Sequence, residues 1–124
     1  MKDSPRRPRG RVARRADLLG TWRIVEMDLW DPEDIDLVGP AFIEFTADRM
    51  GHFRFIAVKG WMDCRHQTID DRPHVDFTWV GVDEEDEVSG RGWARQEPED
   101  SLRGHLYIHL GDDSGFRAVR ADKG

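Results

Sequence analysis

Short segments in which apolar and polar side chains alternate follow one another through most of the chain, and this alternation restricts the fold more than any other feature. Eight such segments, rich in β-branched and aromatic residues, lie between clusters of turn residues. No segment keeps the repeat of about 3.6 residues of an amphipathic helix, so helical crossovers between parallel strands have no room. Alternating segments joined by tight turns are typical of an antiparallel sandwich or an up-and-down barrel. We predict strands over residues 21–27, 41–46, 52–58, 61–66, 74–82, 89–95, 102–110 and 115–121.

Large rings supply much of the predicted core. The chain has 124 residues, which suits one domain, and it holds five Trp and six Phe. Each of these rings buries roughly 150–250 Å². Closure of the sheet into a barrel also removes the exposed edges that a flat sheet has to protect. We therefore predict a single all-β domain over residues 18–124, an up-and-down barrel of eight antiparallel strands.

The alternation does not decide the inward face of two of these strands. In residues 61–66 we favour the face that carries Met62 and Cys64 as the inward one. In residues 89–95 two faces compete, one with Gly90, Gly92 and Ala94, the other with Arg91, Trp93 and Arg95. Both faces of this second strand stay open at this point.

The positive charge gathers at the start of the chain. Residues 1–17 hold seven basic and two acidic residues, a net charge of +5, whereas the whole chain carries −6. The remainder is therefore acidic, at −11. We expect a flexible basic arm over residues 1–17 in front of the barrel domain. Because phosphates repel an acidic body, we expect no nucleic-acid binding except through this arm.

Cysteine usage and hydropathy indicate the compartment. Cys64 is the one cysteine, so no disulfide can form within the chain, which favours a reducing environment. No apolar run approaches the roughly 18 residues of a membrane span, and the first residues do not resemble a secretion signal. We expect a cytoplasmic protein without membrane contacts, and the sequence leaves a homodimer open.

Two sequence features stand at the ends of the predicted domain: Leu19-Gly20-Thr21-Trp22 at its start and Arg120 on its last strand. This Gly-x-Trp start resembles that of the calycins, the group that includes lipocalins and fatty-acid-binding proteins, and Arg120 stands where these families place an arginine over that tryptophan. The long segment 28–40 is similar to the loop after the first lipocalin strand, and we expect its Trp30 to plug one mouth of the barrel. The resemblance implies a barrel of eight or more strands with a small ligand pocket. Avidin-like barrels fit the same pattern.

Side chains that the alternation turns inward form the candidate ligand site. Glu26 follows Trp22 and Ile24 on one side of the first strand, so a closed barrel would aim its carboxylate inward near one end. The carboxylate would lie either at the rim, in water, or inside, where it could bind a ligand or act as an acid or base. His66 would supply a second polar group, and bulky rings would wall the pocket. The candidate ligand-binding residues are Glu26, Phe55, His66, Trp79 and Trp93.

The histidines and the cysteine do not form a recognisable reactive site. His105 and His109 are four residues apart on a predicted strand, about 13 Å, which is too far to share one ion. Tyr107 lies between them, and we expect His105 and Tyr107 to face solvent. Cys64 is predicted to be a buried structural residue. We expect neither a metal nor a cofactor.

The leading interpretation is a small-molecule-binding barrel that holds an apolar or aromatic ligand without catalysis. A first alternative is a small enzyme, of the isomerase, cyclase or hydratase kind, that uses Glu26 and His66 in the cavity. A second alternative is a protein-interaction module, in which a filled barrel supports a docking surface. The sequence does not decide whether the chain catalyses a reaction.

Overall fold

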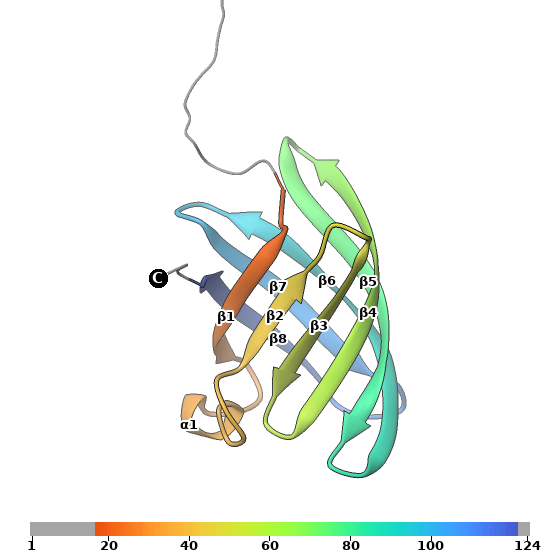
Figure 1. Ribbon diagram of the computed structural model, residues 1–124. Helices are drawn as coiled ribbons and strands as arrows, with labels where there is room; N and C mark the ends of the chain where they lie inside the picture. The colour runs from red at the N-terminus through yellow and green to blue at the C-terminus, as the bar shows by residue number, and fades with distance from the viewer. Residues whose placement is uncertain (1–16, 122–124) are drawn as a thin grey trace, which may run out of the picture.

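Eight antiparallel strands form one closed barrel in the computed structural model, which describes residues 17–121 (Figure 1). Each strand pairs with the next one along the chain, and β8 pairs with β1. The predicted all-β, up-and-down architecture is therefore confirmed. The elements are β1 (Gly20–Met27), α1 (Pro32–Ile35), β2 (Phe42–Phe45), β3 (Met50–Phe55), β4 (Val58–Ile69), β5 (Arg72–Asp83), β6 (Asp86–Glu97), β7 (Ser101–Ile108) and β8 (Asp113–Arg120).

The predicted basic arm lies, apart from Asp17, outside the described residues. Within residues 17–121, no helix has the length and the apolar character that crossing a membrane requires.

The turn between β3 and β4 was predicted in the wrong place. Residues 59–60, which look like a turn in the sequence, lie inside β4, and the chain reverses at residues 56–57 instead. Ile56 adopts a positive φ of 56° there. β-Branched residues rarely take this left-handed conformation, so the sequence carries no turn signal at this point.

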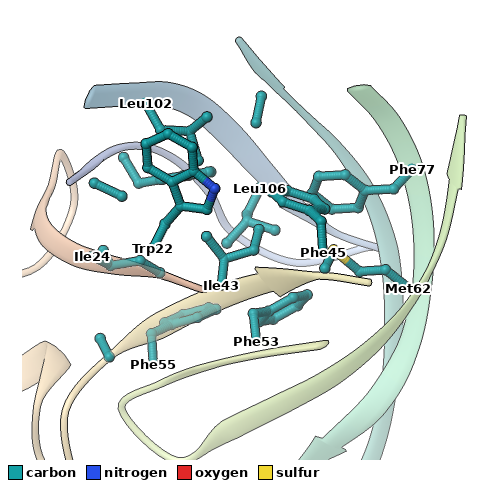
Figure 2. Packing of buried hydrophobic residues seen from close by; sticks show 14 of the residues in the cluster. Trp22, Ile24, Ile43, Phe45, Phe53, Phe55, Met62, Phe77, Leu102 and Leu106 are labelled. Carbon is teal, nitrogen blue, oxygen red and sulfur yellow. The ribbon is translucent and has the colours of Figure 1, made fainter. Parts of the chain in front are cut away.

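Inward side chains fill the barrel, because rings from one strand lie over glycines of the next. A Cβ atom at Gly92 would lie 2.6 Å from Cζ of Phe77, and one at Gly60 would lie 2.3 Å from Cζ of Phe53. The glycines therefore make space that neighbouring rings occupy. Figure 2 shows Phe53, Phe77 and Met62 among the buried side chains of the interior. The largest buried aromatic side chains are those of Trp22, Phe45, Phe53, Phe55, Phe77, Trp79 and Phe116.

The same packing settles the two undecided faces. On β4, Met62 and Cys64 are buried, as favoured. On β6, Gly92 and Ala94 face inward, whereas Trp93 lies on the outside. The glycine-bearing face of β6 turns inward because the rings of β5 already occupy the interior beside it and leave no room for larger side chains.

Trp22 closes one end of the barrel. Its side chain is fully buried, and its indole Nε1 donates a hydrogen bond of 2.9 Å to the carbonyl of Leu18. The guanidinium of Arg120 lies over the ring, with Cζ 4.0 Å from the ring centroid, and donates a hydrogen bond of 2.7 Å to the carbonyl of Leu19. The predicted contact between Trp22 and Arg120 is therefore present.

The segment between β1 and β2 covers the other end (Figure 1). Ile35 of α1 is buried, and its carbonyl accepts a hydrogen bond of 2.8 Å from the N–H of Ile56. The Trp30 ring packs against Phe55, with 5.5 Å between ring centroids. Trp30 thus plugs this mouth of the barrel, as expected.

Candidate functional site

Glu26 does not point into the barrel, contrary to the prediction. The pairing of β1 with β8 shifts register between Ile24 and Glu26, which is a β-bulge. The extra residue reverses the alternation, so Met27 is buried and Glu26 turns outward. Its side chain is 60% exposed and pairs with Arg117 at 3.2 Å. A cavity carboxylate at this position is therefore excluded.

Trp93 also lies outside the barrel, so it cannot wall an internal pocket. Its ring stacks on His74 at a centroid distance of 5.9 Å and an interplanar angle of 8°. The guanidinium of Arg95 lies 5.6 Å from the centre of the same ring. Trp93 belongs to an outer surface that combines arginines with rings.

Phe55 and Trp79 are the two predicted residues that the structure brings near one another. Both are buried, and both contact Phe53, with ring centroids 5.9 Å and 5.0 Å away. The Trp79 Nε1 atom is buried and has no hydrogen-bond partner among residues 17–121. Phe55 and Trp79 thus contribute to a packed interior.

His66 lies apart from these rings, on an exposed stretch of β4. Its imidazole meets Phe45 edge to face, with 5.8 Å between the ring centroids. This partial burial lowers the pKa of His66 below its ordinary value. Because Glu26 is on the outside of β1, the two groups assigned to the enzymatic alternative do not share a site.

Cys64 is a structural residue in the core. Burial raises the pKa of its thiol from the ordinary value to about 11. At pH 8 this shift reduces the fraction of the reactive thiolate about 100-fold.

We expect Ellman's reagent to label Cys64 at least 100-fold more slowly in the native protein than in the protein unfolded in urea. Equal rates in the two states would contradict this burial.

A groove of about 400 Å³ lies across β5, β6 and β7; Thr78, Arg91 and Tyr107 line it from the outer face, and Ile108, which packs against the core, lines it from the inner side. Thr78, Arg91 and Tyr107 are direct neighbours across these three strands. The Arg91 guanidinium lies over the Tyr107 ring, with Cζ 4.1 Å from the ring centroid. The residues that line the groove are Thr78, Gly90, Arg91, Tyr107, Ile108, His109 and Leu110.

A histidine–carboxylate pair borders this groove. The His105 ring lies beside Tyr107, with 4.5 Å between centroids. Its Nε2 atom is 2.6 Å from Oδ2 of Asp113. This pair fixes the orientation of the imidazole and places a polar edge beside the Tyr107 ring.

Three arginines cross the same outer surface in a line that we call the arginine row: Arg95, Arg103 and Arg117. Arg103 on β7 lies directly opposite both others. Arg95 pairs with Glu97 at 2.9 Å, and Arg117 pairs with Glu26. Arg103 has no ion pair with any residue in the described range 17–121.

A smaller pocket, of about 80 Å³, lies on another part of the outer surface, over β2, β3 and β4. Phe42 and Trp61 line it, and Trp61 of β4 lies directly opposite Val80 of the adjacent strand β5. Trp61 and Val80 are 51% and 64% exposed, so this is an apolar part of the surface.

No functional role was predicted from the sequence for the outer surface of β5–β8, because His105 and Tyr107 were expected simply to face solvent. They do face outward, but a groove and an arginine row accompany them. The sequence did contain a pattern that points to this surface. Arginines and aromatic rings take every second position in residues 91–95 of β6 and in residues 103–107 of β7. Adjacent antiparallel strands that alternate in this way place their polar and aromatic residues on one face.

Comparison with known proteins adds no assignment. No family model, curated protein or solved structure matches the chain. The closed eight-stranded barrel is compatible with a calycin-like fold. Among residues 17–121, no group of three His, Cys, Asp or Glu side chains is arranged to hold a metal ion.

Proposed function

We propose that the chain is a non-catalytic, small-molecule-binding protein of calycin-like architecture whose ligand lies on the outside of the barrel, in the groove over β5–β7. The groove itself, about 400 Å³ in volume, carries this proposal. Pockets for small ligands commonly have about 300–1,000 Å³. The packed interior supports an outer site, because rings fill the space beside the inward glycines.

The chemistry of the groove favours a flat ligand with negative charge. Tyr107 offers an aromatic surface, and Arg91 already lies against it in the geometry of a cation–π contact. A planar ring can insert beside this pair and stack on the guanidinium as well as on the phenol. Ile108 and Leu110 add apolar surface at one side of the groove. A flat aromatic or heterocyclic anion could stack on the tyrosine, pair with the arginine and contact the apolar side chains.

The single tyrosine of the chain allows a direct test. Tyr107 is the one tyrosine in the sequence, so labelling with 3-fluorotyrosine gives one ¹⁹F resonance that reports on the groove. We expect planar aromatic anions from a metabolite library to shift this resonance. Arg91→Gln should weaken their binding at least tenfold, because a charge-assisted contact contributes about 1.5–3 kcal/mol. Tyr107→Phe, measured by calorimetry, should retain the ring and most of the affinity.

Trp61→Ala serves as the matched control, because it removes an exposed ring beside the smaller pocket. Its ligand affinity should stay within about twofold of the unmodified protein. The proposal is wrong if no compound moves the Tyr107 resonance. It is also wrong if a compound binds and Trp61→Ala, rather than Arg91→Gln, abolishes the binding.

A further inference from the structure

The arginine row holds three like charges next to one another. Arg103 faces Arg95 on one side and Arg117 on the other. Like charges directly opposite each other in a sheet are destabilising. The carboxylates of Glu97 and Glu26 offset the positive charges of the two outer arginines. The charge of Arg103 is left without an acidic partner within residues 17–121, in a body whose net charge is strongly negative.

The groove and the arginine row belong to one continuous surface. Arg91 of the groove and Arg95 of the row are four residues apart on β6, which is about 13 Å along a strand. Trp93 projects from the same side of β6 between them and lies opposite His105 of β7. A ligand that fills the groove and reaches the row is therefore extended, with a ring at one end and negative charge at the other.

We propose that the ligand class is a phosphorylated compound with a planar ring, of which a nucleoside diphosphate is the simplest example. The ring occupies the groove beside Tyr107, and the phosphates bind the arginine row with Arg103 as the central donor. This inference rests on the proposed function, since it names the ligand of that same groove. Phosphate suits the row because it carries about −1.5 to −2 charges and three acceptor oxygens, enough for more than one guanidinium.

Acidic turns limit the length of the ligand at both ends of this surface. The turn after β6 carries Glu99 and Asp100 beyond the arginine row, and the turn before β8 carries Asp112 beyond Tyr107. A long polyanion would extend past the arginines into these carboxylates and be repelled. The surface therefore fits a single nucleotide better than a nucleic-acid strand.

Calorimetric titration with ADP, adenosine, pyrophosphate and a twelve-nucleotide oligothymidylate tests this assignment. ADP should bind at least tenfold more tightly than either adenosine or pyrophosphate, because it alone engages both ends of the site. Arg103→Gln should weaken ADP binding at least tenfold and leave adenosine binding unchanged. Its melting temperature should not fall, because the substitution removes a repulsion. Arg65→Gln, which removes an exposed arginine on β4, should change ADP affinity less than twofold.

The outcomes separate this inference from the proposed function. If other planar anions shift the Tyr107 resonance but ADP binds no better than adenosine or pyrophosphate, the phosphate assignment fails and the groove proposal stands. If no compound shifts that resonance, both fail. Tighter binding of the oligothymidylate than of ADP would overturn the single-nucleotide assignment in favour of a nucleic-acid strand. An unchanged ADP affinity in Arg103→Gln would also overturn it.

Discussion

Replacing Trp22 with alanine is expected to lower the free energy of unfolding by about 3–5 kcal/mol, measured by urea denaturation. The substitution removes a fully buried indole together with its hydrogen bond to Leu18 and its contact with Arg120. A domain of this size has a total stability of about 5–15 kcal/mol, so much of it depends on this residue. Trp61→Ala is the matched control, because Trp61 is half exposed, and should cost less than about 1 kcal/mol.

A double-mutant cycle isolates the part of the lost unfolding free energy that comes from the contact between Trp22 and Arg120. Combining Trp22→Phe with Arg120→Ala should reveal a coupling of about 0.5–2 kcal/mol, the range of a cation–π contact. The phenylalanine variant keeps a ring at this end of the barrel and so remains measurable if the alanine variant does not fold. Additive effects of the two substitutions would show that Arg120 does not stabilise the ring.

Gly81→Ala should destabilise the barrel by about 3 kcal/mol, at the upper end of the usual cost of overpacking. A Cβ atom at Gly81 would lie 1.8 Å from the carbonyl oxygen of Lys59 and 2.9 Å from Cα of Gly60. Both neighbours are backbone atoms of β4, so no rotation of a side chain can relieve the clash. The strand pairing itself would have to open at this point, and the loss is measurable as a lower melting temperature.

Gly111→Ala provides the control for this glycine. Its added methyl group would meet side-chain atoms of Ile108 at 3.2 Å, a neighbour that can shift by a few tenths of an ångström. We expect a change below about 1 kcal/mol. Comparable losses at Gly81 and Gly111 would contradict the explanation by backbone contact.

Alternation of side chains was enough to predict the fold and most of its core. It placed Trp22, Phe55 and Trp79 inside and gave the correct number and order of strands. It failed at Glu26, because a bulge inserts one residue and reverses the two faces of a strand. A bulge depends on how two strands distant in the sequence pair, which a local pattern does not contain.

The candidate site was less predictable, for a second physical reason. Gly92 and Ala94, on one of the two faces that the sequence left open, do face inward, but the ring of Phe77 from the neighbouring strand occupies the space beside Gly92. Sequence patterns count the side chains of one strand, whereas cavity volume depends on the combined packing of several. Tyr107, which the pattern assigned to solvent, lines the groove together with Arg91, and His105 lies beside it; these outward side chains are the stronger candidates.

The seam between β1 and β8 has a consequence for how the chain reaches its native state. All other strand pairs join strands that follow one another in the chain and can form from nearby segments, whereas the seam joins residues almost a whole domain apart in sequence. Long-range pairing costs more chain entropy and is slow to form. We therefore expect a late intermediate that is an open, curled sheet with two free edges. Such edges pair readily with other chains, so the speed of this last step governs how much protein escapes aggregation during refolding.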